Sequence, residues 1–95
     1  MFLIMIHYKQ PIDVVEKNLI AHRAFLEEGY KKDFFIVSGP RNPRIGGVLV
    51  SQLKDKSQLE DIIKQDPFNV NGVADFEIIE FDPVKYHKDF SCFIE

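Results

Sequence analysis

The chain has 95 residues, of which 45% are hydrophobic and 28% are charged, a balance typical of one globular domain rather than of a disordered chain. Its net charge of −3, carried by scattered acidic and basic residues, argues against a nucleic-acid partner, which needs a clustered basic face. No apolar run reaches the roughly 20 residues of a membrane span, and the start of the chain has no marks of a signal peptide. With a single cysteine, Cys92, no internal disulfide can form, so we expect a cytoplasmic protein.

Hydrophobic periodicity and turn residues predict six elements. Pro11 suits the first turn of a helix, because the amide donor that proline lacks has no partner there. Asp55 is a predicted N-cap, with Gln58 three residues further on completing the pattern of a capping box. Pro67 should stop this second helix at Asp66. In chain order we expect a strand at 2–8, a helix at about 12–31, strands at 34–38 and 48–53, a helix between 55 and 66, and a strand at 74–81.

This order predicts a ferredoxin-like α+β fold, βαββαβ, with a four-stranded antiparallel sheet. Two helices can cover only one face of such a sheet, yet the predicted strands are apolar on both faces. We therefore expect a homodimer that pairs through its sheet faces as an α/β barrel, with an edge-paired or tail-capped monomer as the alternative. Residues 1–95 should form one domain, with a core at about 2–82 and an apolar tail at 83–95 that packs on the core or on the dimer partner.

His22 is the residue whose position is least expected. It lies on the apolar stripe of the first predicted helix, in line with Leu19 and Leu26, on the face that a helix normally buries. The predicted topology brings the end of the first strand, Ser38 and Asp66 to the same end of the domain, within reach of the imidazole. A buried histidine is more often a hydrogen-bonded core residue than a catalyst, so a structural role is the alternative.

The chemistry of these side chains suits proton transfer. A carboxylate such as Asp66 would fix the tautomer of His22 and stabilise the imidazolium that forms when the ring accepts a proton. Ser38 would donate to a substrate oxygen or orient the ring. As substrate-binding residues we expect Arg44, which otherwise is simply solvated, together with the two aromatic residues Tyr8 and Phe68. No metal site is predicted, because the remaining histidines have no metal-ligand spacing, and no cofactor is expected.

Five segments in a fixed order carry a resemblance to a known family. They are FLIMIHY (2–8), AHRAFLEEGY (21–30), VSGPRNPRIGG (37–47), QDPF (65–68) and EIIEF (77–81). Together they resemble the YciI-like, or YCII-related, proteins of the dimeric α/β-barrel superfamily, over about residues 2–87. The resemblance implies a sheet-paired dimer and an active site made of His22, Asp66 and Ser38. It also implies elimination or isomerisation on small, often aromatic-derived rings.

Three hypotheses of function follow. The first is a small cofactor-independent lyase or isomerase in which His22 moves a proton, Asp66 orients it and Ser38 binds a substrate oxygen. The second is a non-catalytic module that binds or senses a small molecule in the same cleft. The third treats His22 as a packed core residue with no role in a site.

Overall fold

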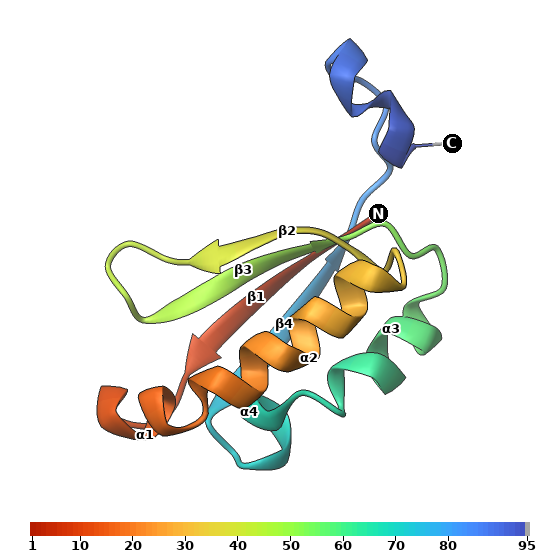
Figure 1. The fold of residues 1–95 in the computed structure, drawn as a ribbon. Helices are drawn as coiled ribbons and strands as arrows, with labels where there is room; N and C mark the ends of the chain where they lie inside the picture. Colours follow the sequence, from red (N-terminus) through yellow and green to blue (C-terminus); the bar gives the residue numbers. More distant parts are fainter. Residues whose placement is uncertain (95) are drawn as a thin grey trace.

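The computed structural model describes residues 1–94 and has an α+β architecture, with one antiparallel sheet of strand order β2-β3-β1-β4 (Figure 1). The chain forms β1 (Phe2–Tyr8), α1 (Ile12–Lys17), α2 (Leu19–Lys31), β2 (Phe35–Pro40), β3 (Gly46–Ser51), α3 (Lys56–Ile63), α4 (Pro67–Val70), β4 (Ala74–Glu80) and a 3₁₀ helix (Lys88–Phe93). The predicted ferredoxin-like fold is confirmed.

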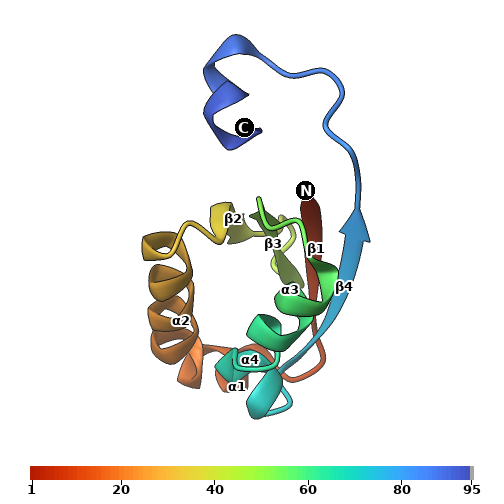
Figure 2. The same ribbon diagram turned by 90° about the vertical axis from the view of Figure 1, so that its right-hand side faces the viewer.

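The core lies between the sheet and the helices α2 and α3 (Figure 2). Alternate residues of β1, namely Phe2, Ile4 and Ile6, are buried, because successive side chains of a strand point to opposite faces. Leu49 of β3, which pairs with Ile4 in the register, lies on the same face. Because β1 is paired on both sides and its inner face is covered, it forms the centre of the fold.

The predicted long helix at 12–31 is wrong in one respect, because Asn18 divides it into α1 and α2. Asn18 is a turn residue with φ −103° and ψ 0° that both ends α1 and precedes α2, and its side-chain amide donates to the carbonyl of Val14. Its side-chain oxygen accepts from Asn71, at the end of α4. Asparagine competes well for backbone groups in this way, which is why it interrupts helices. The end of the helix at Lys31 agrees with the prediction.

The hairpin between β2 and β3 is longer than predicted. The prediction ended β2 at Ser38 and began β3 at Val48, whereas both strands continue to Pro40 and Gly46. A side chain at position 46 would collide with the backbone of Ile6, so glycine allows β3 to pair with β1 up to this point.

The segment around Asp66 also differs from the prediction. The helix that begins after Asp55 ends at Ile63, and the carboxylate of Asp55 caps it by accepting from the amide of Ser57. Asp66 does not end that helix but begins a new one, α4, with Pro67 as its first residue. Proline is accepted at a first helical position as readily as it stops a helix, so the sequence alone fits both arrangements.

The face of the sheet turned away from α2 and α3, which we call the open face, has apolar residues on all four strands and charged ones toward one end. The apolar residues include Leu3, Met5, Val37, Val50 and Ile79, and the titratable ones are His7, Asp75 and Glu77. After β4 the chain leaves the body of the molecule, and the 3₁₀ helix lies on the same side of the sheet as the open face (Figures 1 and 2). Among residues 1–94, no helix has the length and apolar character needed to cross a membrane.

Candidate active site

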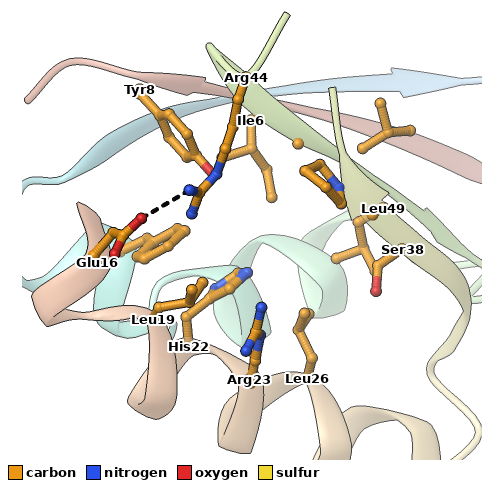
Figure 3. Close-up of a pocket in the computed structure, with 15 residues that line it drawn as sticks. Ile6, Tyr8, Glu16, Leu19, His22, Arg23, Leu26, Ser38, Arg44 and Leu49 are labelled. Carbon is orange, nitrogen blue, oxygen red and sulfur yellow. Dashed lines mark hydrogen bonds and ion pairs between the residues drawn. The ribbon is translucent and has the colours of Figure 1, made fainter. Parts of the chain in front are cut away.

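A pocket of about 530 Å³ lies between the sheet and the N-terminal half of α2 (Figure 3). Its walls come from six elements that are distant in sequence: β1, α1, α2, β2, β3 and α4. Its apolar lining comes from Ile6 and Leu49 on the sheet and from Leu19 and Leu26 on α2. This combination of a largely apolar cavity and a few convergent polar groups is typical of a small-molecule site.

His22 and Asp66 form a buried hydrogen-bonded pair at the wall of this pocket. The Nδ1 atom of His22 lies 2.9 Å from each carboxylate oxygen of Asp66. Asp66 is completely buried, whereas His22 is 7% exposed and lines the cavity. Because a carboxylate can only accept, Nδ1 carries the proton, and the lone pair of the ring lies on Nε2. Nε2 has no hydrogen-bond partner in residues 1–94, so it is free to accept a proton.

The backbone around Asp66 and the ring of Phe68 hold this pair in place. Oδ1 of Asp66 also accepts from the amide of Phe68, as the N-cap of α4. The ring of Phe68 stacks on His22 with a centroid distance of 3.9 Å and an interplanar angle of 2°. The imidazole is thus fixed by its hydrogen bond in the plane and by the stacking perpendicular to it.

Ser38 lies across the pocket from His22, on β2 (Figure 3). Its hydroxyl forms a hydrogen bond with the hydroxyl of Tyr30, and no bond joins it to His22. Either hydroxyl can be the donor, so the Ser38–Tyr30 pair can present a donor or an acceptor to a ligand.

Arg44, from the loop between β2 and β3, lies at the mouth of the pocket. Its guanidinium donates to a carboxylate oxygen of Glu16 on α1 over 2.9 Å (Figure 3). The hydrogen bond to Glu16 raises the pKa of Arg44 above its ordinary value, and the neighbouring Tyr8 adds to this effect. Arg44 therefore stays cationic, and its charge is already balanced by Glu16.

The structure thus brings five of the six predicted site residues to the wall of one pocket, with Asp66 directly behind His22. Phe68 is an exception in its orientation, since it is 1% exposed and one face of its ring lies against His22. Of the charged lining residues, sequence reasoning missed two, Glu16 and Arg23. Charged residues beside the apolar stripe of a helix are normally interpreted as solvent-exposed. The one feature of the sequence that could have pointed to Arg23 is its position next to His22.

The part of the chain that the structure describes contains no group of three or more His, Cys, Asp or Glu side chains arranged to hold a metal ion. His7 lies on the far side of β1, where it contacts Arg41 and Glu77. His87 caps the 3₁₀ helix and lies outside the pocket.

Comparisons with known proteins agree with this architecture. A model of the YCII-related domain matches residues 1–82. A solved structure with a similar fold is 5-chloro-2-hydroxyhydroquinone dehydrochlorinase from Burkholderia phenoliruptrix AC1100, in complex with 2,5-dihydroxybenzoquinone. The two chains are 20% identical with a TM-score of 0.69, and the match covers 86% of this chain and 94% of the other. No functionally curated protein matches the chain.

Proposed function

The chain belongs to the family of YCII-related domains, and on this premise we propose that it is a small enzyme that moves a proton on a planar, aromatic-derived substrate, as a lyase or an isomerase without a cofactor. The observation that carries the proposal is the buried His22–Asp66 pair, which leaves Nε2 of His22 at the wall of a cavity large enough for one small molecule. Such a pair is the arrangement that a general base needs.

His22 acts as the base. Nε2 accepts a proton from the substrate, and Asp66 stabilises the resulting imidazolium through the hydrogen bond at Nδ1. The electron pair left on the substrate either expels a leaving group, as in a lyase, or moves along the conjugated ring and is protonated at another atom, as in an isomerase. In the second case His22 returns the proton.

The other predicted residues bind the substrate. Ser38, supported by Tyr30, receives a substrate oxygen opposite His22. Arg44 and Tyr8 bind at the mouth, while Phe68 acts from behind by holding the imidazole plane. The solved structure with the similar fold supports a lyase, because that protein is named as a dehydrochlorinase of a hydroxylated ring and was solved with a planar quinone.

The test is turnover of a panel of chlorinated and unchlorinated hydroxyhydroquinones and hydroxyquinones. Chloride release reports elimination, and incorporation of deuterium from heavy water, read by NMR, reports reversible proton removal. We expect at least one of these activities in the wild-type protein and its loss in His22→Gln. His87→Gln is the matched control, because it makes the same change at a histidine outside the pocket and should retain activity.

The outcomes separate the hypotheses of function. Equal activity in His22→Gln and in the wild type would contradict the proposal. A panel member that binds in the pocket but is returned unchanged, without deuterium exchange, would support a non-catalytic binding module instead.

We also propose that the chain functions as a homodimer paired through the open face. The exposed apolar side chains Val37 and Ile79 lie on that face, and the 3₁₀ helix of the tail lies on the same side of the sheet (Figure 2). Exposed or half-buried aliphatic residues on all four strands are typical of an interface rather than of a solvated sheet. The mass of the protein in solution tests this proposal.

A further inference from the structure

Resting on the proposed function, we propose that the substrate carries a negative charge on a planar conjugated oxygen group, a carboxylate or an enolate, and that Arg23 receives this charge. Arg23 is thereby the residue that determines specificity for anions over neutral molecules of the same shape. The inference depends on the balance of charges around the pocket, on the orientation of Arg23 and on the shape of the cavity.

The charges that line the pocket leave one cation without a counterion. Four lining residues can carry charge: Glu16, His22, Arg23 and Arg44. Arg44 is paired with Glu16, and Nδ1 of His22 is paired with Asp66, whose carboxylate lies behind the ring and is fully buried. Arg23 is exposed to solvent, and its guanidinium forms no ion pair or hydrogen bond with residues 1–94. An anionic ligand in the pocket would therefore meet a guanidinium that no acidic side chain among these residues occupies, and it would replace water there.

Arg23 is directed into the cavity although another partner is within range. Glu27 lies four residues further along α2, the spacing at which side chains on a helix form ion pairs. No such pair is present within the described residues, and Figure 3 shows the guanidinium beside the ring of His22, turned toward the cavity. The cation therefore lies next to the atom that is proposed to take the proton.

The cavity also favours a flat ligand with oxygen atoms at its edge. The ring of His22 is held parallel to that of Phe68, so it presents a fixed edge to the cavity, and leucine and isoleucine side chains from both α2 and the sheet give the cavity apolar walls. A guanidinium is planar and donates in a fork, which matches a carboxylate or two neighbouring ring oxygens. A positive charge at this place also stabilises the anion that forms on proton removal.

The experiment compares two probes of nearly equal shape, salicylate and the neutral salicylamide, by NMR titration of the wild-type protein. A hydrogen-bonded charge of this kind is worth about tenfold to a hundredfold in affinity, so we expect salicylate to bind more tightly by that ratio. Arg23→Gln should abolish the preference, and Arg23→Lys should retain part of it. Arg41→Gln is the matched control, because Arg41 lies outside the pocket and contacts His7.

Equal affinities for the two probes, including no binding of either at millimolar concentration, would overturn the inference, as would a preference that persists in Arg23→Gln. Because binding is measured without turnover, this result is independent of whether the protein is an enzyme. Loss of the preference in Arg23→Gln together with a catalytically silent His22 would leave the anion site intact and refute only the proposed function.

Discussion

At the scale of single residues, the site depends on which nitrogen of His22 carries the proton. The carboxylate of Asp66 forces the proton onto Nδ1, and the amide of Phe68 fixes the carboxylate in turn. The proposed base thus owes the position of its free lone pair to Asp66, which does not line the cavity. A change at Asp66 can therefore inactivate the site without altering its lining.

Asp66→Asn tests this dependence. The oxygen of the new amide is needed by the amide of Phe68, so its NH₂ group faces Nδ1 and donates to it, which shifts the proton of His22 to Nε2. Turnover should fall on the order of a thousandfold, because the lone pair no longer faces the substrate. Two-bond ¹H–¹⁵N correlation spectra of the histidine rings report the tautomer directly.

Asp55→Asn is the control for this variant. It makes the same change at the N-cap of α3, outside the pocket, and should alter neither tautomer nor turnover. An Nδ1-protonated ring in Asp66→Asn, together with lost turnover, would contradict the tautomer argument.

A second prediction concerns the ion pair at the mouth of the pocket. Glu16→Gln removes the counterion of Arg44 and leaves two free guanidinium groups around the cavity. Anionic probes such as salicylate should then bind more tightly than to the wild type, while salicylamide should not, because the additional attraction is electrostatic. NMR titration at low salt measures both. Glu28→Gln, a change in an exposed pair on α2, is the control, and tighter binding of both probes would contradict the prediction.

The residues of the site were predictable to different degrees. His22 stands out in sequence because a titratable group interrupts an apolar stripe, and its partner Asp66 follows once the topology is assigned. The contact between Glu16 and Arg44 was not predictable, since it joins a helix to a loop and neither residue departs from the pattern of a solvated surface. The hydrogen bond from the hydroxyl of Tyr30 to Ser38 was not predictable for a different reason. An aromatic residue on the buried stripe of a helix is normally interpreted as a core residue without a polar role.

At the scale of elements, the packing of α2 against β2 depends on Gly29. A methyl group at this position would lie 2.1 Å from the ring of Phe35, which is itself buried. Gly29→Ala should therefore lower the free energy of unfolding by up to about 2 kcal/mol, because overpacking costs about 1–3 kcal/mol and the better helix propensity of alanine returns about 1 kcal/mol. Urea unfolding followed by circular dichroism measures this change.

Phe35→Leu provides the matching test. It shortens the side chain that collides, so the double variant with Gly29→Ala should lose about 1 kcal/mol less than the sum of the two single losses. Strict additivity would show that the two residues do not interact and that the cost of Gly29→Ala arises elsewhere.

Element boundaries were harder to predict than element types, for local reasons. The hydrophobic period continues through Asn18, so nothing in it marks the break between α1 and α2, which depends on a contact with Asn71 that is 53 residues away. Asp66-Pro67 fits both a helix end and a helix start, and the choice depends on the hydrogen bond from His22 to Asp66. In both places a residue that fits two local structures makes a local hydrogen bond and a distant one, and the sequence pattern does not show the distant one.

At the scale of the whole molecule, the open face is the part of the sheet that the helices leave uncovered. The helices cover one side of the sheet, and the other side has aliphatic residues on all four strands. A single copy has only its tail on that side, and the tail extends away from the body of the molecule (Figure 2). The fold of the monomer thus follows from the order of the elements, whereas its second face is left to the second copy that we propose.

Ile79→Lys tests the proposed dimer. Ile79 lies on β4, is 41% exposed in the single chain and points from the open face, so a lysine there should be tolerated by the monomer. In a face-to-face dimer the same lysine would lose its water, and dimerisation should weaken about a hundredfold or more, equivalent to about 3 kcal/mol. Sedimentation velocity over a range of concentrations measures the change. Ile20→Lys, on the exposed side of α2, is the control and should leave the mass unchanged. A wild-type protein that sediments as a monomer, or an Ile79→Lys protein that remains as dimeric as the wild type, would show that the open face is not the interface.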